Sequence, residues 1–225
     1  MTAAVEAPEG STTRPLTGLA RTAARRMVKA WEAPVFHLGV DVDMRSALAA
    51  SGNGITVTDL LVRACTTALA AHPAVNAHYA DEVITLWDDI NVGIAVATEA
   101  GLMVPVIQQA HSLDLEGLAA ARRDLVARSR EGALKMADVS GGTFTISNLG
   151  MLGIDEFDAI LNVPQVAILA VGSTRQQPRL VDGETQWLPI ARLTLTCDHR
   201  ALDGATGAQF LATLRADLEG ATASR

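Results

Sequence analysis

The sequence predicts an α/β protein, an α+β sandwich in which helices flank one mixed β-sheet. Segments with helical spacing alternate along the chain with short runs of β-branched residues. One run, residues 164–173, is almost continuously apolar, which is typical of a central strand covered on both faces. The 225 residues, 49% of them hydrophobic, suffice for one large domain, or at most two small ones, with a substantial core.

The chain is expected to begin with a disordered tail or linker remnant over residues 1–14, because this stretch is small, polar and contains Pro and Gly. A single domain is then predicted over residues 15–225. Its first helix is predicted over 17–31, where basic residues recur every four positions and so share one face. Pro34 ends that helix, because proline cannot continue it.

A strand is predicted next, over residues 35–42, and then a buried helix over 58–71 that Thr58 or Asp59 caps. A third helix is predicted from Ser112 to about residue 130. Between these two helices the sequence predicts three short β-rich segments: 82–87, 90–98 and 102–107.

The C-terminal part is predicted to hold the longest strands. Glycines and β-branched residues over 141–150 indicate a strand that leads into a turn. Residues 179–199 are predicted to form a hairpin that turns at Asp182-Gly183. The last helix is predicted over 203–219, which completes the helical layers around the sheet.

The formal charge of −7, from 18 basic and 25 acidic residues, argues against sequence-independent nucleic-acid binding, although local basic patches for small anions remain compatible with it. Only two cysteines are present, Cys65 and Cys197, and we interpret both as free thiols in a reducing compartment. The start of the chain has no apolar core of a signal peptide, and no run approaches the roughly 20 apolar residues of a membrane span. We therefore expect a cytoplasmic protein.

The strongest candidate for chemistry lies at the end of the predicted hairpin, where Asp198-His199-Arg200 is followed by Asp203-Gly204. A histidine at a strand end is held by the sheet and open on one side. This suits a general base, because an imidazole's unperturbed pKa of about 6.5 is close to neutral pH. The alternative is a buried histidine bonded to the backbone, with Asp203 as a simple helix cap.

Other catalytic or metal-binding patterns are missing from the sequence. The remaining histidines show no HExxH or Cys₂His₂ spacing, so no metal is predicted. There is no Walker loop, no GxGxxG and no GxSxG elbow. Cys197 and His199 share a strand face, but we interpret Cys197 as a small packed hydrophobe.

The segment from Asp198 to Gly204 matches the DHRxxDG signature, and the chain resembles the catalytic (core) domains of 2-oxo acid dehydrogenase complex dihydrolipoamide acyltransferases, within the chloramphenicol acetyltransferase-like superfamily. The resemblance runs in order from about Pro15 to the C-terminus. Further segments resemble the family's N-terminal helix, central hairpin, serine-bearing strand and buried strand: residues 25–27, 91–96 with 101–106, 142–150, and 164–169.

The resemblance implies a chloramphenicol acetyltransferase-like fold in a trimeric building block, with the active site between subunits. His199 then corresponds to the base that takes a proton from the thiol of coenzyme A or dihydrolipoamide, which has a pKa near 8.5. Ser147, from the neighbouring subunit, corresponds to the donor to the oxyanion. Asp203 corresponds to the residue that positions the histidine loop, with Arg25 or Arg26 as its candidate partner.

The resemblance also implies a coenzyme A channel, with coenzyme A as a substrate. By position in the family pattern, Thr56, Asn148, Gly172 and Ser173 line this channel and Arg45 supplies positive charge. The alternative for Arg45 is a solvated helix residue.

The lipoyl group is expected on a separate domain, because Lys29 and Lys135 both lack the context of a lipoylated turn. Expected partners are a homotrimer or larger core, the lipoyl domain and the other subunits of the dehydrogenase complex. The weakly apolar end, residues 218–225, leaves assembly beyond the trimer open. The phrase Ser-Asn-Leu-Gly favours acetyl or branched-chain acyl groups over succinyl.

Two other functions remain open at this point. One is a coenzyme A-dependent acyltransferase of the same fold that acylates a small hydroxyl compound. The other is a non-catalytic scaffold core, which we would expect to lack the histidine. The presence of His199, Ser147 and Asp203 favours the enzyme.

Overall fold

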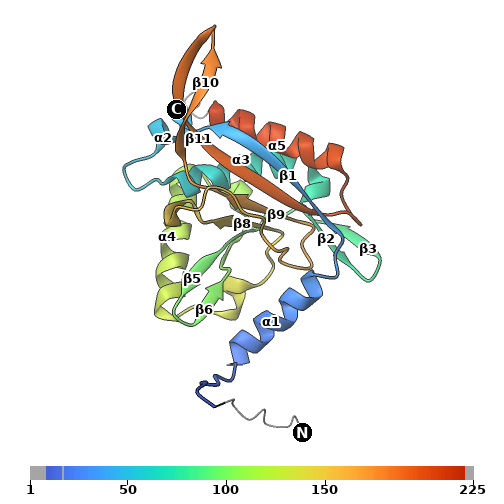
Figure 1. The fold of residues 1–225 in the computed structure, drawn as a ribbon. Coiled ribbons are helices and arrows are strands. Elements are labelled where there is room, and N and C mark those ends of the chain that lie inside the picture. The colour runs from blue at the N-terminus through green and yellow to red at the C-terminus, as the bar shows by residue number, and fades with distance from the viewer. Residues whose placement is uncertain (1–8, 17, 221–225) are drawn as a thin grey trace.

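A computed structural model describes residues 9–16 and 18–220 of the protein and contains one mixed sheet flanked by helices (Figure 1). The strand order is β1-β11-β9-β8-β4-β7, and β10 pairs with β11 beyond the body of the sheet. The predicted α/β class is therefore confirmed. The strands of this sheet are β1 (Val35–Asp43), β4 (Val92–Ile94), β7 (Val106–Ile107), β8 (Phe144–Asn148), β9 (Ala167–Val171), β10 (Arg175–Val181) and β11 (Glu184–Asp198).

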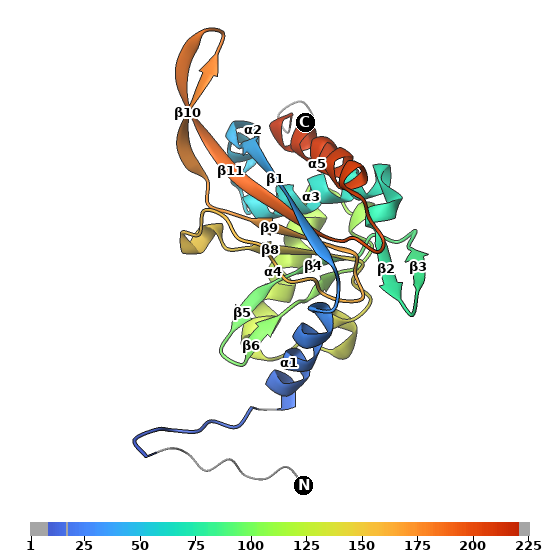
Figure 2. The same ribbon diagram turned by 45° about the vertical axis from the view of Figure 1, so that its right-hand side comes forward.

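Helices α3 (Val57–Ala71), α4 (Leu115–Glu131) and α5 (Gly204–Glu219) pack on one face of the sheet and enclose the main hydrophobic core with it (Figures 1 and 2). Helix α1 (Gly18–Ala30) projects away from the sheet, and its side chains are largely exposed. The short α2 (Arg45–Ala50) follows β1.

The other face of the sheet is covered by the segment 154–163 rather than by a helix. Ala159 and Leu161 of this segment pack against Ile168 and Ala170 of β9 in a second, smaller core. All five residues of β9 are buried, so its near-continuous apolar sequence is explained by contacts on both faces. The prediction of a central strand within 164–173 is confirmed, with the strand itself limited to Ala167–Val171.

The predicted hairpin is also confirmed. Asp182 and Gly183 both have positive φ, 51° and 84°, as the two-residue turn between right-twisted strands requires. Strand β11 is 15 residues long, so its first part pairs with β10 alone and its last part pairs with β1 and β9. This register places Asp198 at the end of the strand, opposite Val35.

Two helix starts differ from the prediction. Thr56, not Thr58 or Asp59, precedes α3: its main-chain N–H and its hydroxyl donate to Oδ2 of Asp59, at 2.7 and 2.8 Å. Asp59 is thus inside the first turn, where its buried carboxylate also pairs with Arg122. Helix α4 is capped by Asp114, two residues after the predicted Ser112, because the Asp114 carboxylate accepts the N–H of Gly117.

The family-like central hairpin is divided in the structure. Strands β4 and β7 pair in the main sheet, with β7 at its edge, whereas β5 (Val96–Thr98) and β6 (Gly101–Met103) form a separate two-stranded sheet. A second small sheet joins β2 (Ala77–Ala80) and β3 (Val83–Leu86). The described part also contains four short 3₁₀ helices: Pro73–Val75, Ala110–Ser112, Met136–Val139 and Gly150–Leu152.

Both cysteines are free and buried. Burial raises the pKa of the Cys65 thiol strongly and that of Cys197 to about 12. A thiol with so high a pKa gives almost no thiolate at neutral pH, so Cys197 behaves as the packed hydrophobe that we predicted. Across residues 9–16 and 18–220, no helix is long and apolar enough to span a membrane.

Candidate active site

His199 is exposed and follows directly after the last residue of β11. Its main-chain N–H donates to the carbonyl of Pro34 at 2.9 Å, which continues the pairing of β1 and β11 by one residue. Its imidazole packs against the Phe36 ring, with 4.6 Å between ring centroids. The alternative of a buried histidine is therefore wrong, and the imidazole is open to a reactant.

The turn that carries His199 is built around Asp198, which is 2% exposed. Its carboxylate accepts hydrogen bonds from Nε and Nη2 of Arg200, at 2.9 and 2.6 Å, and from the Arg200 main-chain N–H at 3.0 Å. Its carbonyl accepts the N–H groups of Ala201 and Leu202, at 3.1 and 3.0 Å. The guanidinium of Arg200 lies 4.2 Å from the centroid of the Tyr79 ring.

Asp203 caps helix α5, because its Oδ1 accepts the main-chain N–H of Thr206 at 2.8 Å. Hydrogen bonds from the backbone and side chain of Thr206 hold the pKa of Asp203 below its usual value, and the nearby His199 contributes a little. Among the described residues of this chain, neither Arg25 nor Arg26 acts on Asp203, and both arginines are exposed on α1. The arginine partner of Asp203 stays a prediction.

We predict that Asp203→Ala lowers the thermal midpoint at neutral pH and that Asp203→Asn largely retains it, because an amide oxygen can also accept the Thr206 N–H. The folded-state pKa of Asp203 is depressed, so its stabilisation is present above the unfolded pKa of about 3.9 and is lost as pH falls through the folded pKa. Thermal denaturation from pH 7 to pH 3 should show the gap between wild type and Asp203→Ala closing at the acid end. An unchanged acyl-transfer rate in Asp203→Ala would remove Asp203 from the active site.

Ser147 and His199 lie far apart within one chain. Ser147 on β8 pairs with Ala170 of β9, and Ala170 in turn pairs with Thr194 of β11. His199 lies five residues beyond Thr194, which corresponds to about 17 Å along a strand. The two residues also use opposite faces: Ser147 alternates with Ile146 of the main core, whereas His199 contacts Phe36 on the helix-covered side.

Three predicted coenzyme A residues meet at the turn that follows Ser147. Oδ1 of Asn148 accepts the N–H of Gly150 at 2.9 Å, and Oγ of Ser173 donates to the carbonyls of Gly150 and Ile154 at 2.9 and 3.0 Å. A Cβ on Gly150 would lie 2.6 Å from the carbonyl oxygen of Gly172. The cluster of Asn148, Gly172 and Ser173 therefore shapes one tight turn at the ends of β8 and β9.

We predict that Gly172→Ala destabilises the fold, by about 1–3 kcal/mol, because the new Cβ would collide with the main-chain oxygen of Asp155. The segment that covers the second face of the sheet would have to move. Gly18→Ala is the matched control, since a Cβ there meets nothing within 4 Å and α1 favours alanine. Chemical denaturation of both variants measures the difference, and equal midpoints would contradict the steric argument.

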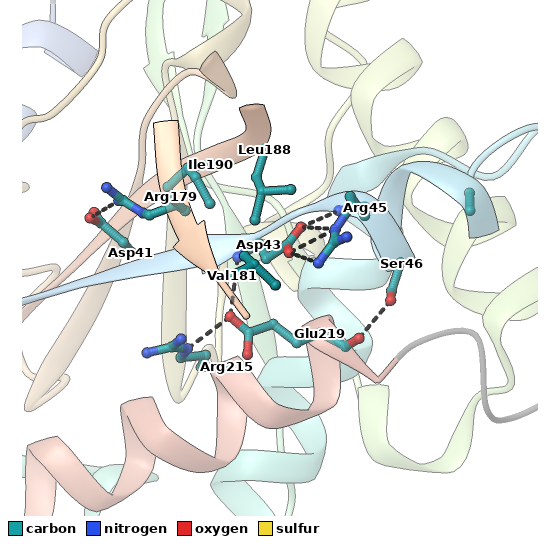
Figure 3. Close-up of a pocket in the computed structure, with 11 residues that line it drawn as sticks. Asp41, Asp43, Arg45, Ser46, Arg179, Val181, Leu188, Ile190, Arg215 and Glu219 are labelled. Carbon is teal, nitrogen blue, oxygen red and sulfur yellow. Dashed lines mark hydrogen bonds and ion pairs between the residues drawn. The ribbon is translucent and has the colours of Figure 1, made fainter. Parts of the chain in front are cut away.

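The two other coenzyme A candidates do not join this cluster. Thr56 is bonded to Asp59 at the start of α3. Arg45 lines a cavity of about 810 Å³ between β1, α2, α5 and the β10–β11 hairpin (Figure 3). Its guanidinium binds Asp43 through Nε and Nη2, at 2.8 and 2.6 Å, so a phosphate would have to displace that carboxylate.

Charges in this cavity are paired throughout. Burial alone would raise the pKa of Asp43, but hydrogen bonds from Arg45 hold it below its usual value. Arg215 binds Glu219 at 2.8 Å, and Arg179 binds Asp41 (Figure 3). The cavity offers cations and anions in similar measure, which favours the solvated-residue alternative for Arg45 over a polyanion site.

The described residues bring together no group of three His, Cys, Asp or Glu that could hold a metal ion. Two residues of the site were missed from the sequence. Phe36, which packs on the imidazole, was part of a predicted strand but not of the predicted site, and Tyr79, which covers Arg200, carried no local signal. Both contacts depend on the pairing of distant strands.

The family model described as "2-oxoacid dehydrogenases acyltransferase (catalytic domain)" matches residues 8–224 of the chain. The chain is 35% identical over 211 residues to the dihydrolipoyllysine-residue acetyltransferase component of the pyruvate dehydrogenase complex of Zymomonas mobilis, covering 89% of this chain and 48% of that protein. It thus spans about half the length of the curated relatives that it matches.

Solved structures show the same likeness. A probable dihydrolipoamide acetyltransferase from Listeria monocytogenes superposes with a TM-score of 0.92 at 30% identity, covering 97% of this chain and 98% of that one. A chloramphenicol acetyltransferase superposes with a TM-score of 0.56 at 13% identity, covering 86% of this chain and 94% of that one. The second likeness concerns the fold alone.

Proposed function

The chain belongs to the family of 2-oxoacid dehydrogenase acyltransferase catalytic domains, and on this premise we propose that it moves an acyl group between the thiol of dihydrolipoamide and coenzyme A within a 2-oxo acid dehydrogenase complex. The observation that carries the proposal is the exposed imidazole of His199. It stands at the end of β11, on a turn in which Arg200 forms an ion pair with Asp198. Neither coenzyme A nor the lipoyl group is a permanent part of this chain in the proposal, since both are substrates.

In the proposed reaction, His199 takes the proton from the attacking thiol, because a thiol with a pKa near 8.5 is mostly protonated at neutral pH. The thiolate sulfur forms a bond to the thioester carbonyl carbon, and the carbonyl oxygen becomes an oxyanion. Ser147 of a second copy donates a hydrogen bond to that oxyanion. The bond to the departing sulfur then breaks, and this thiolate receives the proton from the His199 imidazolium.

We propose a homotrimer as the smallest active unit. The separation of about 17 Å between Ser147 and His199, on opposite faces of the sheet, supports a site that two copies complete. The proposed partners are a lipoyl domain, which carries the acyl group, and the other subunits of the dehydrogenase complex. The molecular mass of the assembly in solution distinguishes a trimer from a larger core built of trimers.

We propose acetyl as the transferred group, ahead of branched-chain acyl groups and succinyl. The name of the Zymomonas relative, an acetyltransferase component, supports this order. The functional domain is proposed to cover residues 15–225. The proposed compartment is the cytoplasm, although some relatives are mitochondrial or chloroplastic proteins.

The deciding experiment measures acyl transfer from acetyl-, isobutyryl- and succinyl-coenzyme A to free dihydrolipoamide. The proposal expects turnover with dihydrolipoamide, fastest with the acetyl donor. A panel of small hydroxyl acceptors, chloramphenicol included, tests the competing chemistry in parallel. Transfer to a hydroxyl acceptor but not to dihydrolipoamide would overturn the proposal, and a well-folded oligomer with no turnover would favour a scaffold.

A further inference from the structure

The ring of Tyr79 lies against the turn that carries His199, although Tyr79 belongs to a different sheet. In both ribbon views the β2–β3 hairpin lies beside the connection between β11 and α5 (Figures 1 and 2). The contact itself is a cation–π pair: the Arg200 guanidinium lies 4.2 Å from the centroid of the Tyr79 ring. No step of the proposed reaction uses either residue.

Arg200 is the only partner that neutralises Asp198 among the described residues, and Asp198 is 2% exposed. A buried carboxylate depends on its cation, because an unpaired charge in the protein interior is strongly disfavoured. The side chain of Arg200 is itself 34% exposed, so water competes for it. The ring of Tyr79 covers one face of the guanidinium and thereby limits its escape from Asp198.

Tyr79 is itself held in place by the main chain. Its N–H donates to the carbonyl of Pro164 at 2.8 Å, and Tyr79 pairs with Ile84 across the β2–β3 hairpin. The N–H of Asp198 donates to the carbonyl of Val166, two residues after Pro164. The main chains of Tyr79 and Asp198 are thus anchored on the same short stretch of chain, and the Arg200 guanidinium lies between the Tyr79 ring and the Asp198 carboxylate.

We propose that Tyr79 is a positioning residue for His199, which acts by clamping Arg200 onto Asp198 and so fixing the turn that presents the imidazole. The inference rests on the proposed function for its catalytic consequence, but not for its structural one. Tyr79 does not touch the reacting atoms. Its role is to keep the Asp198 carbonyl in place for the N–H groups of Ala201 and Leu202, which define the turn.

Two substitutions separate the ring face from the hydroxyl. Tyr79→Leu removes the aromatic face and is expected to lower kcat about 10-fold to 100-fold, with an unchanged KM for coenzyme A, because a small displacement of a catalytic group far from the substituted atom is costly. Tyr79→Phe keeps the face and is expected to stay within about 2-fold of wild type. Val83→Ala, on the same hairpin and 60% exposed, is the matched control.

A double variant tests whether Tyr79 acts through Arg200. Arg200→Lys keeps the positive charge but loses the planar fork and most of the stacking. Tyr79→Leu should then cause little further loss of kcat in the Arg200→Lys protein, since the clamp is already open. If the two substitutions instead lower kcat by independent factors that multiply in the double variant, Tyr79 does not act through Arg200.

Hydrogen exchange read by mass spectrometry tests the clamp without reference to activity. The peptide spanning residues 198–202 should exchange faster in Tyr79→Leu, and at the wild-type rate in Tyr79→Phe and Val83→Ala. Unchanged exchange in Tyr79→Leu would overturn the inference, and so would faster exchange with an unchanged kcat. If wild-type turnover proves independent of His199, the proposed function fails, and the exchange rates alone then decide whether Tyr79 orders the turn.

Discussion

Replacement of His199 by alanine is expected to lower kcat for acyl transfer to dihydrolipoamide by about 10²-fold to 10⁴-fold, the usual range for a lost general base. The reason is local: the imidazole is exposed and packs against the tilted Phe36 ring, while the His199 main-chain N–H donates to the Pro34 carbonyl. The described residues place no second histidine in that turn. Steady-state kinetics with acetyl-coenzyme A measures the effect. The loss should fall on kcat rather than on the KM for either substrate.

His37→Ala is the matched control for this substitution. His37 lies on β1 next to Phe36, but its side chain is on the other face of the sheet, where Nδ1 lies 2.9 Å from Oγ1 of Thr196. We expect its kcat to stay close to wild type. The exposed position of His199 also predicts that His199→Ala keeps its fold and oligomeric state. A variant that loses its circular dichroism spectrum together with its activity would point to a structural role instead.

Replacement of Ser147 by alanine is expected to lower kcat by about 10²-fold to 10³-fold, as for the loss of one donor to an oxyanion. Ser147 is half-buried on β8, and a hydroxyl-to-hydrogen change there leaves no large cavity. Stability should therefore change little, and the loss should not be recovered at saturating coenzyme A. Ser140→Ala, at an exposed serine outside the site, serves as the control.

Mixing the two inactive variants tests whether Ser147 and His199 come from different copies. If His199→Ala and Ser147→Ala subunits are unfolded together and refolded as random trimers, about one quarter of the sites should pair an intact histidine with an intact serine. Activity should then return to about one quarter of wild type. A mixture as inactive as its components would show that both residues act within one chain, against the strand register described above.

The sequence by itself determined the elements whose signals are local. Asp182-Gly183 specifies the hairpin because both residues tolerate the positive φ of its turn. Asp203 specifies the start of α5 because its side chain bonds three residues ahead. The continuous apolar run around β9 predicts burial on both faces wherever that strand lies. The DHRxxDG pattern identified the candidate base because its signal is also local: the end of β11, the turn with His199 and the start of α5 follow one another within seven residues.

Tertiary structure alone decided the contacts between residues distant in sequence. Asp59 lies in the first turn of α3, and its pairing with Arg122, 63 residues away, has no local signal in the sequence. No local pattern places Tyr79 against Arg200. Helix α1, which carries the arginine candidates for pairing with Asp203, projects away from the sheet. The physical reason is common to all of these: helix caps and turn φ angles depend on a few neighbouring residues, whereas strand register and helix docking follow from burial of the whole core.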